Sequence, residues 1–169
     1  MTKFFNRNRK PIHRREFVIG SLLLTGFITS GCLAHPAAKA PKILFVCQAG
    51  TAKSPIAREI FKKRAKERGI VVDVFSRGIV VEDHVSLQLK DRLRADGIDT
   101  NAEPALSLQP ADWAAADILV NFNPLPESVK HKDVRDWSDT PSVNDDYANA
   151  RASMNKRIDA LLTEIASRK

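Results

Sequence analysis

The feature that most constrains the fold of this chain is the segment Cys47-Gln48-Ala49-Gly50-Thr51-Ala52-Lys53-Ser54. It follows an apolar run at residues 43–46 and leads directly into Pro55 and a helical pattern. A strand, a loop of small residues and a helix start form a site for an oxyanion, because loop amides and the helix N-terminus direct hydrogen-bond donors and positive dipole to one point. A cysteine placed in that field is activated as a thiolate nucleophile. The sequence therefore predicts an anion-binding loop that carries a nucleophilic Cys47.

The spacing of this segment also resembles a known family. A Cys, five residues, a basic residue and a Ser between a strand and a helix resemble the loop of the low-molecular-weight protein tyrosine phosphatases, Cys-x-Gly-Asn-x-x-Arg-Ser. They equally resemble the thioredoxin-coupled arsenate reductases that share this fold. Cys47, Ser54, Pro55 and Ala57 match the family pattern. Taken alone, Cys47 would be interpreted as a small apolar residue at the end of a buried strand; the basic residue and Ser-Pro at this spacing favour the family interpretation.

The loop departs from the family pattern at three positions. Ala49 replaces Gly, Gly50 replaces Asn and Lys53 replaces Arg. The last change bears directly on chemistry, because Arg grips phosphate with a planar two-pronged fork whereas Lys offers a point charge. The resemblance therefore implies the fold, and the activity depends on what Lys53 can do.

Apolar patterns after residue 41 predict alternating strands and helices. Strands are expected at residues 43–46, 71–75, 118–120 and 134–137; helices are expected from Ser54, as N-cap, to Gly69, and across 85–97, 110–116 and 147–165. This alternation predicts an α/β fold, a small three-layer domain with a four-stranded parallel sheet flanked by helices, over residues 41–169. The same order of elements resembles the phosphatase family throughout. A ligand is expected beyond the C-terminal strand ends, where Cys47 lies.

The resemblance implies a mechanism in which Cys47 attacks phosphorus and forms a thiophosphate intermediate. The substrate-binding residues would then be the rest of the loop: Gln48, Ala49, Gly50, Thr51, Ala52, Lys53 and Ser54. Ser54 has two candidate roles, donation to the Cys47 thiolate and capping of the helix. Arg77 is either a surface residue in a turn or a substitute for the missing loop guanidinium.

A carboxylic acid should protonate the leaving oxygen. The family supplies it as an Asp immediately before Pro, but here Thr140 precedes Pro141 and Asp139 lies one residue earlier. Asp139 is therefore the candidate general acid, and its alternative role is that of an ordinary turn aspartate.

Further differences from the family bear on the substrate. Ser142 and Val143 stand where phosphotyrosine enzymes commonly have a pair of tyrosines, so a narrow aromatic slot is not expected; Trp113 and Trp137 are interpreted as packing residues. Cys47 is the one cysteine after residue 40, so a self-contained thiol relay is impossible. Three hypotheses follow: a phosphatase acting on accessible phosphomonoesters, a non-catalytic oxyanion-binding module, and an arsenate reductase that uses an external thiol.

The first 40 residues are interpreted as an export signal. Basic residues precede an apolar run at residues 17–28, which is shorter than the roughly 20 residues that span a bilayer. Residues 14–18, Arg-Arg-Glu-Phe-Val, resemble a twin-arginine signal, and the alternative is an ordinary Sec signal. Export would place the protein in the periplasm after passage through the twin-arginine machinery.

The cleavage site of this leader has three candidates. Residues 29–32, Thr-Ser-Gly-Cys, resemble a lipobox, which would make Cys32 a lipidated N-terminus and a membrane anchor. The other candidates are an Ala-x-Ala site at residues 38–40, which Pro41 would hinder, and cleavage after Ala34. The lipoprotein interpretation is preferred.

The charge of the chain is concentrated in the leader. Residues 1–40 hold seven Lys and Arg against one acidic residue, which leaves 20 basic and 19 acidic residues in 41–169. A nearly neutral body does not favour a nucleic-acid partner, whose footprint is a clustered basic surface. No cysteine or histidine cluster of zinc-finger type occurs, and neither a metal nor a cofactor is expected.

Overall fold

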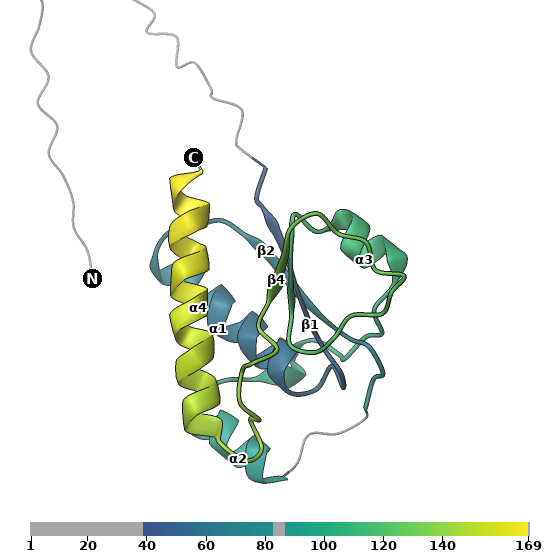
Figure 1. Cartoon of the computed structure of the whole chain (residues 1–169). Helices are drawn as coiled ribbons and strands as arrows, with labels where there is room; N and C mark the ends of the chain where they lie inside the picture. The colour runs from purple at the N-terminus through teal and green to yellow at the C-terminus, as the bar shows by residue number, and fades with distance from the viewer. Residues whose placement is uncertain (1–38, 83–86, 169) are drawn as a thin grey trace, which may run out of the picture. The chain divides into compact units, whose positions relative to one another are not determined.

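A computed structural model describes residues 39–82 and 87–168. Within them, four parallel strands form one sheet in the order β2-β1-β3-β4 (Figure 1). Their bounds are β1 (Lys42–Cys47), β2 (Asp73–Gly78), β3 (Ile118–Asn121) and β4 (Val134–Asp136). Strands β1 and β3 are central and almost fully buried, as an apolar run predicts for a parallel sheet. The expected four-stranded parallel sheet with Cys47 at the end of a central strand is confirmed.

Helices cover both faces of this sheet. They are α1 (Lys53–Glu67), α2 (Leu87–Ala95), α3 (Pro110–Ala115) and α4 (Tyr147–Ser167), with a short 3₁₀ turn η1 (Thr100–Ala102) that the sequence did not predict. Strand β2 begins at Asp73, two residues later than expected, and leaves Val71 exposed. Residues 1–38 of the leader, with Arg14, Arg15 and Cys32, and the expected helix residue Val85 lie outside the described residues. No helix among the described residues is long and apolar enough to cross a membrane.

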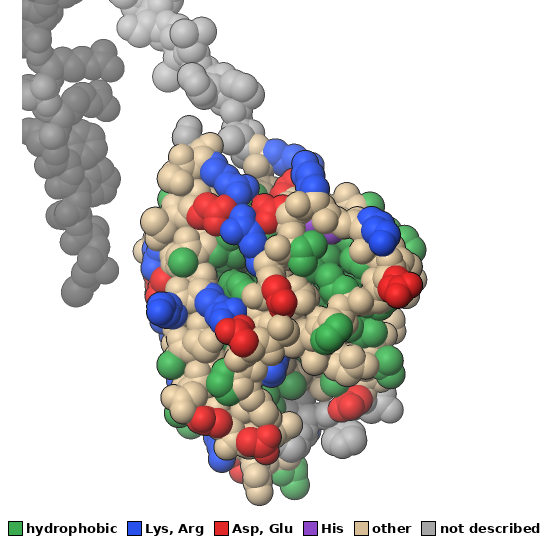
Figure 2. Space-filling model, viewed as in Figure 1, with side chains coloured by type: hydrophobic (Ala, Val, Ile, Leu, Met, Phe, Trp, Pro, Cys, Tyr) green, Lys and Arg blue, Asp and Glu red, His purple; other side chains and the backbone are tan. Residues whose placement is uncertain are grey.

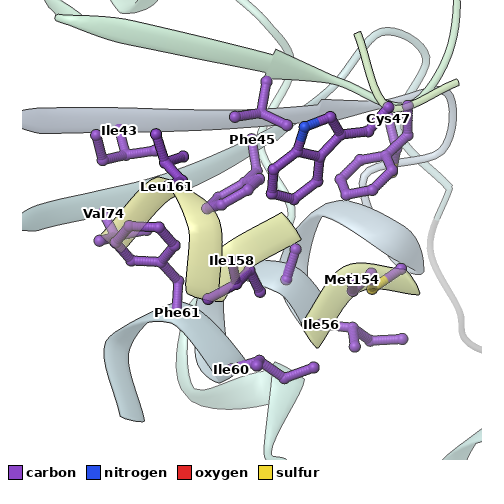
Figure 3. Packing of buried hydrophobic residues seen from close by; sticks show 14 of the residues in the cluster. Ile43, Phe45, Cys47, Ile56, Ile60, Phe61, Val74, Met154, Ile158 and Leu161 are labelled. Atoms are coloured by element: carbon purple, nitrogen blue, oxygen red, sulfur yellow. The ribbon is translucent and has the colours of Figure 1, made fainter. Parts of the chain in front are cut away.

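The larger core lies between the sheet and helices α1 and α4. Alternate β1 side chains, Ile43, Phe45 and Cys47, point into it because successive strand residues face opposite sides. The Phe45 ring packs against Phe61 of α1 at 5.7 Å between centroids and against Trp137 at 5.8 Å. Figure 3 shows this layer, with aromatic and branched side chains filling the space between strand and helices. The aromatic cluster fixes the end of β1 that carries Cys47.

The opposite face of the sheet has a smaller core. Leu44 and Val46 point into it together with Leu119, and Trp113 of α3 packs against them half-buried. Both tryptophans are therefore packing residues, as expected. The face drawn in Figure 2 has Lys and Arg side chains interspersed with Asp and Glu, without a continuous basic surface.

Candidate active site

Cys47 is buried at the C-terminal end of β1, with 3% of its surface exposed. Its Sγ lies 3.1 Å from the Ser54 hydroxyl and accepts a hydrogen bond from the Gly50 amide at 3.3 Å. The Ser54 hydroxyl also lies 3.2 Å from the Arg77 carbonyl oxygen, to which it can donate. A hydroxyl has a single hydrogen. Ser54 can therefore accept from a Cys47 thiol while it donates to the carbonyl, or turn its hydrogen toward a thiolate.

The expected N-cap at Ser54 is wrong. Helix α1 begins at Lys53 with Ala52 at the N-cap, and no side chain makes a capping hydrogen bond there. Ser54 lies inside the first turn, fully buried, and its hydroxyl is engaged by Cys47 and Arg77 instead. Of the two candidate roles for Ser54, the structure shows the contact with the thiol.

Backbone hydrogen bonds hold the loop after Cys47 in one orientation. The carbonyls of Cys47, Gln48 and Ala49 accept hydrogen bonds from the amides of residues 79, 80 and 82, just after β2. In a trans peptide the N–H points opposite to the preceding C=O. The loop amides therefore turn away from that segment, and the Gly50 amide indeed points to the Cys47 sulfur. The Gly50 amide is therefore a donor on the thiol side of the loop, and the Gln48 amide donates to the Asn123 side chain.

The loop depends on a close approach between two glycines. Gly50 has a φ of 71°, a left-handed conformation, and a Cβ built on it would lie 2.9 Å from the Cα of Gly78. The conformation explains the replacement of the family's Asn by Gly at this position, because both residue types enter the left-handed region more readily than others. Gly78 pairs with Cys47 across β2 and β1.

Alanine substitutions at Gly50 and Gly69 should separate the cost of left-handed backbone strain from the cost of a steric clash with Gly78. Gly50→Ala is expected to lower the free energy of unfolding by about 3 kcal/mol, from left-handed strain and from the clash with Gly78. Gly69→Ala is the matched control: its φ of 64° is similar but nothing lies within 4 Å of a Cβ, so about 1 kcal/mol is expected. Urea unfolding of both variants measures the difference, and equal losses would contradict a close loop–strand contact.

Lys53 extends from the first turn of α1 toward the segment before α4. Its Nζ donates to the Thr140 carbonyl at 2.5 Å. Burial lowers the pKa of Lys53 below its ordinary value of 10.5, and the nearby charges of Cys47 and Asp139 act in the opposite direction. The amine thus lies within the electrostatic reach of the thiol, but its hydrogen bond is with the Thr140 backbone.

Asp139 lies at the surface next to this lysine. Its carboxylate pairs with Arg157 of α4 at 2.5 Å, and 72% of its side chain is exposed. Thr140, at the position where the family has its acid, is buried, and its hydroxyl has no hydrogen-bond partner among the described residues. The carboxylate of Asp139 therefore faces solvent and Arg157 in this conformation.

Arg77 does not replace the missing loop arginine. Its guanidinium pairs with Asp112 of α3 at 2.8 Å and lies 5.2 Å from the Phe75 ring centroid. These contacts account for the side chain without the Cys47 loop. Arg77 lies within β2 with 19% of its side chain exposed, so the expected surface position in a turn is also wrong.

A cavity of about 210 Å³ opens beside Cys47. Loop residues line one side, and the other side contains residues that sequence reasoning did not assign to the site, Asn123 and Asn144. The Asn123 side chain accepts a hydrogen bond from the Gln48 amide at 2.9 Å. Asn123 follows strand β3 at the C-terminal edge of the sheet, which is the signal that could have identified it. Ser142 and Val143 also line the cavity, and none of its described lining residues is aromatic.

The described residues contain no group of three His, Cys, Asp or Glu side chains that could hold a metal ion. Cys47 is a free cysteine. The reacting groups that the described part of the chain brings together are therefore a thiol, a hydroxyl, loop amides and the Lys53 amine.

Comparison with known proteins identifies the fold. Residues 42–125 match the sequence model of the family described as "Low molecular weight phosphotyrosine protein phosphatase". No curated protein matches the chain significantly. Among solved structures, YfkJ from Bacillus subtilis is similar with a TM-score of 0.65, at 18% identity over 79% of this chain and 99% of that one.

Two further solved structures with this fold are a phosphatase and an arsenate reductase. SP-PTP, a low molecular weight protein tyrosine phosphatase from Streptococcus pyogenes, is 17% identical over 73% of this chain and 92% of its own, with a TM-score of 0.61. An arsenate reductase in the phosphate binding state is 20% identical over 74% of this chain and 98% of its own, with a TM-score of 0.58. The described domain has the fold of the low molecular weight protein tyrosine phosphatases and arsenate reductases, and its residues 42–125 carry the sequence pattern of that family.

Proposed function

We propose that this chain is an exported member of the low molecular weight phosphatase family that hydrolyses phosphomonoesters through Cys47. The observation that carries the proposal is the placement of the Cys47 sulfur at the end of a central strand, between the Ser54 hydroxyl and the Gly50 amide. Both contacts stabilise a thiolate, because each can donate to the sulfur. The loop amides and Lys53 supply donors and positive charge where phosphate oxygens would lie.

The proposed reaction has two steps. In the first, the Cys47 sulfur forms a bond to phosphorus, the phosphorus–oxygen ester bond breaks, and the leaving oxygen takes a proton from a carboxylic acid. In the second, water attacks phosphorus, the sulfur–phosphorus bond breaks, and the carboxylate takes the proton from water. Phosphate leaves and the thiolate is restored. Such a reaction depends mainly on positioning and electrostatic stabilisation of the phosphoryl oxygens.

The cavity favours small or accessible phosphomonoesters over a deeply inserted aryl group. Its rim contains Asn123, Ser142 and Asn144, and no aromatic residue lines it among those described. Polar side chains can hydrogen-bond a hydrophilic ester, whereas they offer no stacking surface for a ring. A phosphate-release assay on a panel of alkyl and aryl monoesters tests this proposal: release from none of them would overturn it.

Asp139 is the proposed general acid, and its pairing with Arg157 requires it to move toward the leaving group. Asp139→Asn is expected to lower kcat/KM for phenyl phosphate by about 10²-fold, because kcat/KM reports the first step, in which this leaving group needs a proton. The loss should be much smaller for p-nitrophenyl phosphate, which departs as an anion. Asp145→Asn, in the same surface segment, is the control and should leave both rates unchanged. Equal losses on the two esters would contradict the assignment.

A second candidate function is a non-catalytic oxyanion-binding module. The observation that favours it is that the proposed phosphate-binding cation and the proposed general acid both have other partners. Lys53 contacts the Thr140 carbonyl and Asp139 contacts Arg157. Calorimetry with phosphate and sulfate separates the candidates when combined with the assay, because a module binds an oxyanion without turnover. An arsenate reductase with an external thiol is a third candidate, tested by arsenate reduction in the presence of added thiols.

We further propose that the chain is exported through the twin-arginine machinery and anchored by lipid at Cys32. The sequence supports this with Arg14-Arg15 before a short apolar run and with the lipobox-like residues 29–32. The arrangement would place the domain in the periplasm, tethered to a membrane.

Changing both arginines to lysine, Arg14→Lys with Arg15→Lys, is expected to hold the precursor in the cytoplasm, because the receptor reads both side chains. Cell fractionation measures the distribution, and unchanged export would favour the Sec route. Metabolic labelling with a radioactive fatty acid should be lost in Cys32→Ala. Label that persists in that variant, or never enters the natural protein, would contradict the anchor.

A further inference from the structure

Helix α1 carries a buried arginine that the proposed chemistry does not use. Arg58 is 1% exposed. Its Nε donates to the Glu59 carboxylate at 2.7 Å, and its Nη1 donates to the Ser76 hydroxyl at 3.0 Å and pairs with Glu103 at 3.2 Å. The remaining nitrogen, Nη2, is buried and has no hydrogen-bond partner among the described residues. A charged donor left without an acceptor is costly, so this atom indicates a missing partner.

Arg58 lines a cavity of about 300 Å³ that is separate from the one beside Cys47. Gly50 and Thr51 of the loop line it, together with five residues in or just after η1: Thr100, Asn101, Glu103, Pro104 and Ala105. The two cavities share no lining residue, although both touch the same loop. We call this second space the Arg58 cavity.

Four charged side chains line the Arg58 cavity, two cations and two carboxylates. Lys90 of α2 adds a second cation to its wall. Glu103 also lines it, but this carboxylate is already shared by Arg58 and Lys62, whose cations hold its pKa below the usual range. The other acid, Glu82, is exposed to solvent. The charge of Arg58 is paired with Glu59 and Glu103, so what Arg58 lacks among the described residues is an acceptor for Nη2. The exposed Lys90 amine makes no ion pair with another described residue.

We propose that the Arg58 cavity is a second ligand site that binds a small anion through a carboxylate or phosphate oxygen. That oxygen accepts a hydrogen bond from Arg58 Nη2, and Lys90 neutralises the remaining charge. Burial of the guanidinium makes such a bond stronger than one at the surface, and a charged oxygen acceptor is the group that a guanidinium binds best. The proposal does not depend on chemistry at Cys47.

Amide NMR of the full chain, titrated with acetate and separately with phosphate, tests the proposal. Saturable shifts are expected at the amides of Asn101, Glu103 and Ala105, which line the Arg58 cavity and lie outside the Cys47 loop. Phosphate that enters the Cys47 cavity would instead shift Gln48 and Ala52, so the two sites are read separately. Binding of both probes supports the shared oxygen chemistry, and binding of one assigns the ligand class. If neither probe shifts residues 101–105 at millimolar concentration, the proposal is overturned.

Variants locate the ligand within this cavity. Lys90→Ala is expected to weaken binding about fivefold, and Arg58→Lys about tenfold or more, because lysine keeps the charge and loses the Nη2 donor. Ala105→Trp fills the cavity from its wall without removing Arg58, so it keeps the test valid if Arg58→Lys fails to fold. Lys66→Ala removes an exposed lysine elsewhere on α1 and should have no effect. If Ala105→Trp and Lys90→Ala both bind the probes as tightly as the natural protein does, the proposal is also overturned.

Discussion

Replacement of Cys47 with serine is expected to lower phosphate release at least about 10³-fold while phosphate binding is retained. A serine hydroxyl at this position is a far weaker nucleophile than a thiolate, and the helix start and loop amides that contact an oxyanion are unchanged. Loss of turnover with retained binding separates the nucleophile from the cradle. Phosphate release under saturating ester and calorimetry with phosphate measure the two quantities.

The substitution is nearly isosteric, and Cys47 is buried, so urea unfolding of the variant checks that its core is intact. Unchanged phosphate release would show that the thiol is not the nucleophile. Loss of both release and binding with an intact fold would show that the sulfur itself is part of the oxyanion site.

Replacement of Lys53 with arginine is expected to raise kcat/KM by about tenfold to a hundredfold. An arginine can contact the Thr140 carbonyl with one nitrogen and still present two to a phosphoryl group, whereas the Lys53 amine is engaged by that carbonyl. A two-pronged contact that tightens in the transition state corresponds to about 1–3 kcal/mol.

The pH profile provides a second reading of the same variant. Burial lowers the pKa of Lys53, so its amine loses the proton, and with it the attraction for phosphate, at a pH below 10.5. Activity of the natural protein should therefore fall on the alkaline side in that range, and Lys53→Arg should remove the fall because a guanidinium does not titrate there. Lys63→Arg, an exposed lysine on α1, is the control. No gain in rate and an unchanged alkaline limb would remove Lys53 from the mechanism.

The sheet could be predicted because its two central strands are continuous apolar segments of the sequence. Residues 43–46 and 118–120 are apolar throughout, which is the pattern of strands buried on both faces, and both became central strands. The stripe along residues 147–165 likewise predicted α4, whose buried side chains include Met154 and Ile158. Long, strongly periodic segments carry their own signal.

The parts that could not be predicted depend on contacts between distant residues. Ser54 before Pro55 has the local pattern of an N-cap, but the Cys47 sulfur and the Arg77 carbonyl compete for its hydroxyl in the folded chain. The contact between Lys53 and Thr140 joins residues that are 87 positions apart. Neither contact leaves a periodic pattern of apolar residues in the sequence from which it could be predicted. Arg58 was missed for a related reason, since a charged residue in a helix is ordinarily a solvated one.

The Cys47 loop of the site could therefore be predicted, whereas the contacts that surrounding residues make with it could not. The position of Cys47 follows from the strand, the small loop residues and the helix start, all of which are local. The engagement of Lys53 and Asp139 follows from where residues 139–141 lie in three dimensions. These surrounding contacts decide whether the loop catalyses or only binds.

The most direct test of nucleophilic catalysis by Cys47 is to trap the covalent intermediate. The protein is mixed with a phosphate monoester labelled on phosphorus, quenched within its first turnovers, and analysed for label on the peptide that contains Cys47. Label is expected on the sulfur of Cys47, absent from Cys47→Ser and increased in Lys53→Arg. Tight phosphate binding without label on any peptide, and without phosphate release, would contradict nucleophilic catalysis and leave the loop as an oxyanion-binding module.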